Sequence, residues 1–287
     1  MADNKAMWKI NGLAKIVSVV CLASGLAACG GNSYTYRDSG PSRPVDVSHI
    51  PDASPRAEPK SRYGNPSSYV VRGQRYYVKD TARGYVAKGI ASWYGNKFHG
   101  RRTSSGERYD MYAMTAAHKT LPLPTYVRVT NLNNGRSVVV KVNDRGPFHD
   151  NRLIDLSYSA ASKLGILARG TGLVEVRAID PRRPQPASRT AQAPAAVKTS
   201  ASPSAQPLSA PEMYLQVGAF ASRYNAERLK TRLDDIKLPG ILILPGYANQ
   251  QPVFRVRIGP LASVEEADRM ASLLTRYGIS SPHVVID

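Results

Sequence analysis

Hydrophobic and polar residues alternate along several short segments between residues 87 and 180. The segments 126–129 and 137–142 show the two-residue period of half-buried strands. Between them, Asn133-Asn134-Gly135 is typical of a tight two-residue hairpin turn. A further strand is expected at 173–179. The pattern therefore predicts a small β domain made of paired, short strands.

The same region contains one clear helical signal. A helix is predicted from Ser159 to Leu164, with Ser157 near its N-terminus and Gly165 at its end. We also expect a short turn over residues 116–119. Short strands, glycine turns and one or two small helices are typical of a small closed β-barrel.

The last segment, 212–287, contains an internal repeat. Val217-Gly218-Ala219-Phe220-Ala221-Ser222 matches Ile258-Gly259-Pro260-Leu261-Ala262-Ser263. Each copy combines a short strand, a glycine turn and an amphipathic helix, which predicts the order βαββαβ with both helices on one face of a split sheet. The expected strands are 214–217, 241–244, 254–258 and 283–286. The expected buried helix positions are Ala226, Leu229, Leu233, Ala267, Met270, Ala271 and Leu274.

Two segments lack this regular apolar pattern. Residues 29–86 are rich in Ser, Pro, Gly, Arg and Tyr, and we expect a disordered N-terminal tether. Its tyrosine-bearing stretches, 69–72 and 76–78, can pair locally or dock on the following domain. Residues 181–211 are rich in Pro and Ala and contain no acidic residue, which predicts an extended linker.

The N-terminus has the pattern of an export signal. Three lysines precede an apolar run, 16–26, that is too short to span a bilayer. Leu26-Ala27-Ala28-Cys29 then resembles the bacterial lipobox, so residues 1–28 are expected to be a lipoprotein signal peptide and Cys29 the lipidated residue. The alternative is an ordinary cleaved signal peptide. The start codon is either Met1 or Met7.

The composition narrows the possible partners. The net charge is +18 and the isoelectric point is near 10, and no helix-turn-helix or zinc-finger pattern accompanies it. We therefore expect no nucleic-acid partner, and favour a basic surface near anionic lipid or cell-wall polymer. Both cysteines, Cys21 and Cys29, precede the folded part, which leaves no structural disulfide there. No cofactor is expected, and no metal, because His99, His118 and His149 lack the spacing of metal ligands.

The candidate chemistry lies between residues 91 and 165. Glu107 occurs in a Ser-Gly turn, His118 follows it, and an alternating strand leads to Asp144 in a glycine turn. Two carboxylates on separate turns can perform acid and base chemistry on a glycosidic bond. The alternative is that Asp144 caps backbone N–H groups and that Glu107 is a solvated turn residue.

Several motifs together resemble the rare lipoprotein A family. They are Ala91-Ser92-Trp93-Tyr94-Gly95, Phe98-His99-Gly100-Arg101-Arg102-Thr103, Ser105-Gly106-Glu107, Tyr112-Ala113-Met114-Thr115-Ala116-Ala117-His118, Val142-Asn143-Asp144-Arg145-Gly146-Pro147 and Ile154-Asp155-Leu156-Ser157. The opening Tyr214-Leu215-Gln216-Val217-Gly218-Ala219-Phe220 resembles SPOR peptidoglycan-binding domains. The resemblance implies a mainly β plus α+β architecture: a six-stranded double-psi β-barrel (87–180), the linker, and a SPOR domain (212–287). An interaction domain of ferredoxin-like fold is the alternative for the last segment.

The resemblance also implies an activity. Active family members are lytic transglycosylases of peptide-free peptidoglycan strands, and their catalytic Glu, His and Asp correspond to Glu107, His118 and Asp144. Strand alternation places Asp144 on the apolar side with Val140 and Val142, where burial would raise its pKa and suit a general acid. Glu107 is expected to stay ionised in its turn. His118 is expected to position a carboxylate.

Further contacts and the location follow from the same resemblance. Trp93, Tyr94 and Arg145 are candidate sugar contacts, with Trp93 alternatively a core residue; in the SPOR domain the candidates are Gln216 and Arg257. Asp155 is expected to cap the helix that follows it. The location implied is the periplasmic face of the outer membrane, through the lipid anchor, with enrichment at the division septum. The alternatives are an expansin-like protein that binds glycan without cleaving it, and a hydrolase that uses water.

Overall fold

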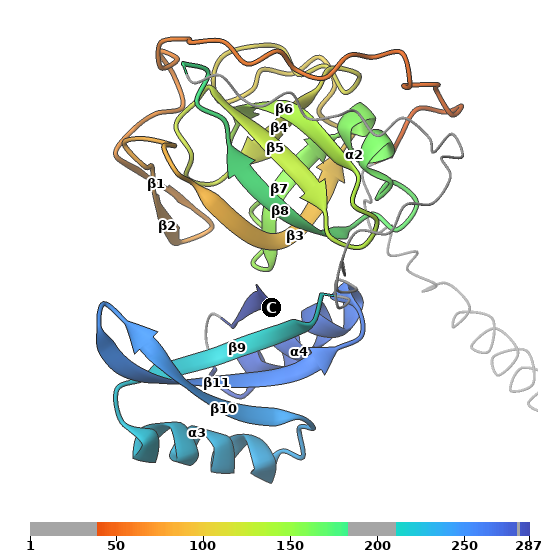
Figure 1. Ribbon diagram of the computed structural model, residues 1–287. Helices are drawn as coiled ribbons and strands as arrows, with labels where there is room; N and C mark the ends of the chain where they lie inside the picture. The colour runs from red at the N-terminus through yellow and green to blue at the C-terminus, as the bar shows by residue number, and fades with distance from the viewer. Residues whose placement is uncertain (1–38, 183–210, 280–281) are drawn as a thin grey trace, which may run out of the picture. The chain divides into compact units, whose positions relative to one another are not determined.

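The computed structural model describes residues 39–182, 211–279 and 282–287 (Figure 1). The expected signal peptide, Cys29 and most of the Pro/Ala-rich linker lie outside these ranges. Within them, no helix has the length and apolar character needed to cross a bilayer.

Six strands close into a barrel in the order β3-β7-β4-β6-β5-β8 (Figure 1). This confirms the predicted six-stranded barrel. Two of its pairings, β3 with β7 and β4 with β6, are parallel, so each pair brings two C-terminal strand ends to the same end of the barrel. The strands are β3 (Val86–Tyr94), β4 (Thr115–His118), β5 (Thr125–Asn131), β6 (Ser137–Asp144), β7 (Arg152–Ser157) and β8 (Gly172–Ala178).

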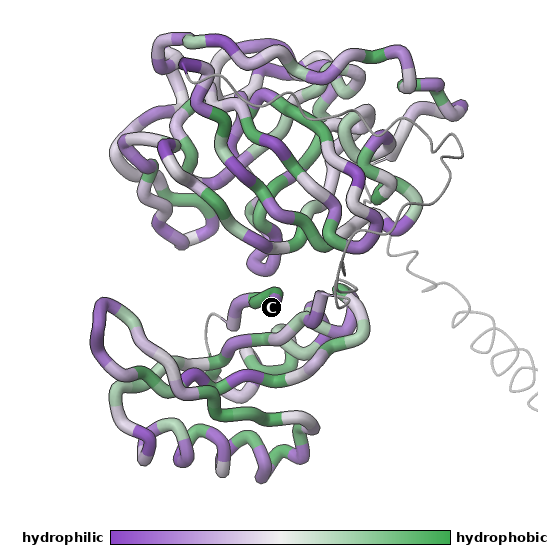
Figure 2. The backbone as a smooth tube through the Cα atoms, in the orientation of Figure 1, coloured by the Kyte–Doolittle hydropathy of each residue, from purple (hydrophilic) through white to green (hydrophobic). Residues whose placement is uncertain are grey.

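The barrel core comes from the alternation along these strands. Val127 and Val129 of β5 and Val138 and Val140 of β6 all point inward and are almost fully buried. The same alternation of hydrophobic and hydrophilic positions is visible along the barrel strands in Figure 2. Since full burial of such a side chain contributes about 1.5–3 kcal/mol, the inward rows stabilise this strand register against a one-residue slip.

The helix and the turns show which local predictions hold. Helix α2 (Tyr158–Leu164) begins after Ser157, whose hydroxyl accepts from Ala160 N, and it ends at the left-handed Gly165, as predicted. Asp155 does not cap this helix; its carboxylate instead accepts a hydrogen bond from the Ser92 hydroxyl.

Two turn predictions are wrong. Residues 115–118 form strand β4, between β7 and β6, and not a turn. The β5–β6 connection is also longer than a two-residue turn. The backbone pair between Asn131 N and Arg136 O closes a loop over residues 132–135. Asparagine side chains explain this loop, because Asn131 Oδ1 and Asn134 Oδ1 accept from backbone N–H groups two residues onward.

The N-terminal segment differs most from its prediction. Residues 39–85, expected to be part of a disordered tether, form an ordered arm on the barrel (Figure 1). Its two short strands, β1 (Ser68–Val71) and β2 (Gln74–Tyr77), pair with each other, which confirms local pairing of the tyrosine-bearing stretches. Asp52 anchors the arm by accepting from Val139 N and pairing with Lys163. Because these bonds are polar and long-range, the apolar pattern does not reveal them.

The C-terminal domain has the predicted βαββαβ order and a four-stranded sheet, β10-β11-β9-β12. Leu215 and Ile258 face the helices, which bury Ala226, Leu233 and Leu274 against them. These positions match the predicted helix faces. The elements are β9 (Met213–Phe220), α3 (Arg223–Asp235), β10 (Ile241–Ala248), β11 (Gln251–Leu261), α4 (Val264–Arg276) and β12 (His283–Ile286).

Candidate active site

The turn over residues 103–107 lies against the C-terminal end of β6. Asp144 Oδ1 accepts from Ser104 N at 2.7 Å, from Ser104 Oγ at 2.6 Å and from its neighbour Arg145 N at 2.7 Å. Ser105 N donates to the carbonyl of Asn143 at 3.2 Å. All three donors to Asp144 bind the same oxygen, which orients the carboxyl group and leaves its second oxygen, Oδ2, outside this set of bonds.

A bulge at Asn143 changes the direction of Asp144. The β4–β6 pairing runs from Ala116↔Val142 directly to Ala117↔Asp144, so Asn143 has no partner of its own. The prediction that Asp144 follows Val142 into the apolar interior is therefore wrong. Asn143 is the buried residue, whereas Asp144 is half-buried at the end of the strand.

Glu107 shares this strand end through two hydrogen bonds. Lys141 Nζ lies 2.8 Å from Glu107 Oε1, and Asn143 Nδ2 donates to Glu107 Oε2 at 2.7 Å. Partial burial raises the pKa of Glu107, but the hydrogen bonds from Lys141 and Asn143 outweigh it and hold the pKa below its ordinary value. With a side chain that is 44% exposed, Glu107 is a solvated, ionised carboxylate.

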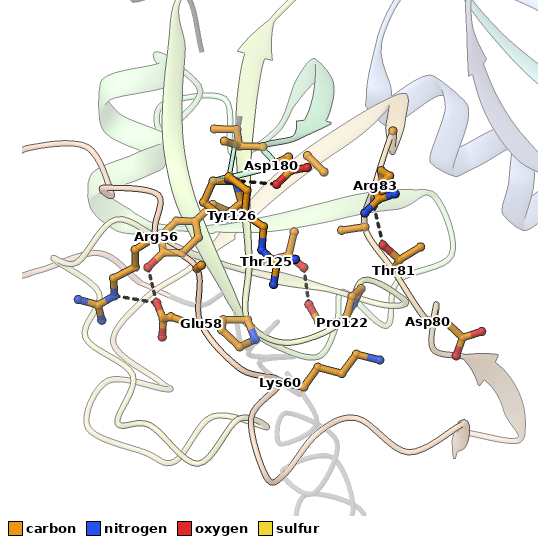
Figure 3. A pocket seen from close by; sticks show the side chains of 18 residues that line it. Arg56, Glu58, Lys60, Asp80, Thr81, Arg83, Pro122, Thr125, Tyr126 and Asp180 are labelled. Carbon is orange, nitrogen blue, oxygen red and sulfur yellow. Dashed lines mark hydrogen bonds and ion pairs between the residues drawn. The ribbon is translucent and has the colours of Figure 1, made fainter. Parts of the chain in front are cut away.

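Glu58 of the arm is the second carboxylate on Lys141. Its Oε2 lies 3.2 Å from Lys141 Nζ, while Arg56 and Tyr126 donate to its Oε1 (Figure 3). Burial raises the pKa of Glu58, but these three neighbours lower it to about 2. Glu58 also lines a cavity of about 320 Å³ beside the barrel, which includes none of the three candidate catalytic residues. Lys141 therefore bridges Glu107 and the arm.

His118 ends β4 and is buried, with 3% of its surface exposed. Nδ1 accepts from Thr120 N at 3.1 Å and from Leu121 N at 3.0 Å, so the ring proton is on Nε2. Nε2 therefore donates to the Tyr85 hydroxyl, which lies 2.9 Å away. Burial lowers the pKa of His118 to about 3. The imidazole is a neutral group that organises the 118–121 loop. Within the described part of the chain its ring is hydrogen-bonded to Tyr85, Thr120 and Leu121, and to neither Glu107 nor Asp144.

Because His118 is buried in its neutral form, we predict that the free energy of unfolding falls as the solution is acidified. The unfolded chain takes up a proton on His118 near the ordinary pKa of 6.5, whereas the folded chain does so only near 3. As the pH falls below about 6.5, each unit lowers the free energy of unfolding by about 1.4 kcal/mol through this group. NMR of the imidazole nitrogens should show His118 neutral and protonated on Nε2 at pH 5. Titration of His118 near pH 6.5 in the folded protein would contradict the assignment.

Arg145 is committed to backbone oxygens. Its Nε and Nη2 donate to Gly64 O at 2.9 and 2.6 Å, and its Nη1 donates to His118 O at 3.1 Å and to Leu121 O. The candidate sugar contact at Arg145 is thus a clamp that joins the arm, the 118–121 loop and the strand end carrying Asp144.

The two aromatic candidates also have internal partners. Tyr94 is 7% exposed and stacks on Tyr109 with the ring centroids 4.1 Å apart, so its ring is not available to a sugar. Trp93 is half-buried and packs edge-on against Tyr158 of α2 at 6.0 Å. This position agrees with the alternative that Trp93 is a core residue.

In the C-terminal domain, Gln216 and Arg257 are cross-strand partners on β9 and β11. They alternate with Leu215 and Ile258, so they lie on the sheet face opposite the helices. Arg257 also pairs with Asp287 at 2.6 Å. Within the described ranges, no group of three or more His, Cys, Asp or Glu residues has the arrangement of a metal site.

Several residues of this site are not predicted from the sequence. Lys141 is indistinguishable from any outward-facing polar residue of an alternating strand. Glu58 and Tyr85 belong to an arm that was expected to be disordered. Asn143 and Ser104 do stand within or beside the quoted motifs, but their roles depend on the bulge in β6 and on the docking of the 103–107 turn.

Two family models match the chain. A model described as lytic transglycolase covers residues 86–177, and a model described as SPOR domain covers residues 210–285. The first range includes Glu107, His118 and Asp144. The second coincides with the C-terminal βαββαβ domain.

Named relatives match over longer ranges. A Pseudomonas aeruginosa protein named endolytic peptidoglycan transglycosylase RlpA is 44% identical over 302 aligned residues, covering 91% of this chain and 88% of that protein. A Vibrio cholerae protein of the same name is 51% identical over 174 residues, covering 60% of this chain and 66% of that protein. Among solved structures, the RlpA SPOR domain from Pseudomonas aeruginosa is 37% identical, with a TM-score of 0.25, and the match covers 25% of this chain and 96% of that one.

Proposed function

The chain belongs to the family of endolytic peptidoglycan transglycosylases named RlpA, and we propose that it cleaves the bond between N-acetylmuramic acid and N-acetylglucosamine to leave 1,6-anhydro ends. The observation that carries this proposal lies at the C-terminal end of β6. Ser104, in the same turn as Glu107, donates to Asp144, and Asn143, the residue before Asp144, donates to Glu107. Both carboxyl groups are thus fixed at one end of the barrel, as acid and base chemistry on one bond requires.

Asp144 is the proposed acid and then base, because it corresponds to the catalytic Asp of the family and its Oδ2 lies outside the hydrogen bonds from Ser104 and Arg145. The protonated carboxyl gives its proton to the glycosidic oxygen as the bond from that oxygen to the muramic C1 breaks. The carboxylate then accepts the proton of the muramic C6 hydroxyl, whose oxygen attacks C1 and closes the anhydro ring. The proton is returned to Asp144, so the step consumes no water. The donors on Oδ1 fix the carboxyl group and direct Oδ2 to this transfer.

Glu107 is the proposed electrostatic partner. Its pKa is held below the ordinary value by Lys141 and Asn143 against the effect of burial, so it remains a carboxylate while C1 carries positive charge. A fixed negative charge at a site of developing positive charge stabilises the transition state more than the ground state. His118 and Arg145 act through other residues, since they hold the 118–121 loop and the end of β6.

A substitution of Lys141 tests how Glu107 is kept ionised. Lys141→Met removes the ammonium group that lies 2.8 Å from Glu107 and leaves burial as the opposing influence. The pKa of Glu107 should rise, so kcat/KM should begin to fall at a higher pH when the solution is acidified. The measurement is the pH profile of product release. Lys163→Met is the matched control, because Lys163 is also paired with a carboxylate, Asp52, but does not contact Glu107. An unchanged acid limb in Lys141→Met would contradict this role.

The two ends of the chain account for substrate and location. We infer that Cys29 carries the lipid anchor in the outer membrane and that the C-terminal domain holds peptide-free glycan, which accumulates at the division septum. The β9–β11 sheet face with Gln216 and Arg257 supports the inferred glycan binding, because polar side chains lie there in register across strands.

The test compares two substrates. Soluble protein, residues 30–287, is incubated with peptidoglycan before and after removal of the stem peptides by an amidase. The proposal predicts release of sugar fragments from the peptide-free strands in large excess. Equal release from both substrates would contradict the substrate class. Retention on the glycan with no release would instead indicate a non-catalytic binding protein.

A further inference from the structure

The arm segment 61–65 lies directly over the turn that carries Glu107. A Cβ atom on Gly64, where φ is +80°, would lie 2.6 Å from the carbonyl oxygen of Ser104, so no larger residue fits there without displacement. A Cβ atom on Gly106, where φ is +95°, would lie 3.3 Å from the ring of Tyr63. Both glycines therefore allow the arm to pass close to the 103–107 turn, and this contact places Tyr63 beside Gly106, the residue before Glu107.

The backbone under Tyr63 is fixed from several sides. Ser61 Oγ donates to Tyr63 O at 2.7 Å, and Ser61 N donates to Leu123 O at 2.8 Å. Asn65 accepts from Leu123 N at 2.7 Å and donates to Leu123 O at 2.8 Å. The segment is thus tied to the loop before β5 by hydrogen bonds that do not involve the Tyr63 side chain.

Tyr63 is nevertheless exposed, with 55% of the residue's surface accessible to water. Hydrophobic packing does not explain why the ring is held there, because a ring that packs in a core is largely removed from water. An exposed aromatic ring with a fixed backbone, next to the turn that carries Glu107, is suited to bind the C–H face of a pyranose. The rings Tyr69 and Tyr76 of the arm differ, because they stack on each other at 5.4 Å and pack near Phe148.

Arg62 adds a charge to this surface. Its guanidinium carbon lies 5.5 Å from the centroid of the Tyr63 ring, and Arg62 has no carboxylate partner among the described residues. An exposed guanidinium that is free of an ion pair can form a bidentate contact with a carboxylate of a ligand.

We propose that Arg62 and Tyr63 form a glycan subsite for an N-acetylmuramic acid residue whose lactyl carboxylate is free. Tyr63 packs against the pyranose with the part of its ring that Arg62 does not cover, and Arg62 pairs with the lactyl carboxylate. In a strand that still carries stem peptides, that carboxylate is an amide and has no charge, so the subsite selects peptide-free strands. This inference rests on the proposed function, and it assigns part of the substrate selection to the arm of the catalytic domain.

The first test uses steady-state kinetics of residues 30–287 on peptide-free glycan. Tyr63→Ala should raise KM about tenfold, which corresponds to about 1.4 kcal/mol of lost binding, while Tyr63→Phe should stay near the wild-type value because the stacking surface is kept. Tyr77→Ala is the matched control, since Tyr77 is an arm tyrosine that is 68% exposed and lies outside the subsite. Equal KM values for Tyr63→Ala and Tyr77→Ala would overturn the subsite.

The second test addresses the carboxylate. Peptide-free glycan is converted to its lactyl methylamides, which removes the negative charge and keeps the sugar. Arg62→Gln should raise KM for the untreated glycan about tenfold and leave KM for the methylamide glycan at the wild-type value. Arg83→Gln, on the same arm, is the control and should affect neither. An equal rise on both substrates in Arg62→Gln would overturn the role of the carboxylate.

A third measurement separates this inference from the activity itself. In the Asp144→Asn variant, the ring resonances of Tyr63, identified by comparison with Tyr63→Phe, are followed by NMR while short peptide-free glycan fragments are added. Shifts that saturate with fragment concentration support the subsite even if the protein cleaves nothing. Unchanged Tyr63 resonances would overturn the subsite even if the wild-type protein releases anhydro sugars.

Discussion

Asp144→Asn is expected to lower kcat for glycan cleavage about a thousandfold. The amide cannot donate and then accept the proton that moves between the glycosidic oxygen and the C6 hydroxyl, and general acid–base groups contribute about 10²–10⁴-fold to such reactions. The substitution conserves the shape of a side chain that accepts hydrogen bonds from Ser104 and from its own neighbour's backbone, so the fold should persist. The measurement is the rate of product release from peptide-free glycan.

Two controls make this result specific to catalysis. The C-terminal domain, 212–287, should still retain the variant on glycan, because its sheet face is independent of the barrel's acid group. Asp110→Asn removes an exposed carboxylate that accepts a hydrogen bond from Tyr112 N and lies 3.8 Å from His99 Nδ1, and it should leave the rate unchanged. Cleavage by Asp144→Asn at the wild-type rate would refute the proposed acid.

Glu107→Gln should reduce kcat/KM about a hundredfold. The variant keeps an oxygen to accept from Asn143 but loses the negative charge that faces the positive charge at C1 in the transition state. Removal of one such electrostatic contact in a site of this kind typically costs about 10²–10³-fold in rate. The loss should appear mainly in kcat, since the charge develops on the way to the transition state.

The matched control for Glu107 is Glu175→Gln on β8. Glu175 is also a barrel carboxylate paired with a cation, Arg177, in an ion pair of 2.9 Å, and among the described residues it forms no hydrogen bond with the 103–107 turn. It should leave kcat/KM near the wild-type value. A loss confined to KM in Glu107→Gln would indicate that Glu107 binds the sugar without stabilising the transition state.

The elements of both domains follow from local pattern and caps. Alternation along residues 137–142 identifies β6, and the N-cap Ser157 and the C-cap Gly165 set the two ends of α2. The repeat in the C-terminal domain predicts its strand and helix order because each copy has a complete amphipathic unit. These features depend on neighbours within one turn or one strand, which is why the sequence alone is sufficient for them.

The site itself depends on contacts that no local pattern encodes. The bulge at Asn143 turns Asp144 away from the interior, and simple alternation has no signal for it. Arg145 and Tyr94 have the residue types of sugar contacts, yet backbone oxygens engage the first and an aromatic stack buries the second. Glu58 reaches Lys141 across 83 residues of sequence through polar contacts, so hydrophobic periodicity does not detect it.

The most direct test of the whole account is the chemistry of the new sugar ends. Soluble residues 30–287 are incubated with amidase-treated, peptide-free peptidoglycan, and the released fragments are identified by mass spectrometry. The account predicts fragments that end in 1,6-anhydro-N-acetylmuramic acid, because the C6 hydroxyl and not water attacks C1. Fragments with reducing ends, each heavier by one water, would contradict it and would identify a hydrolase.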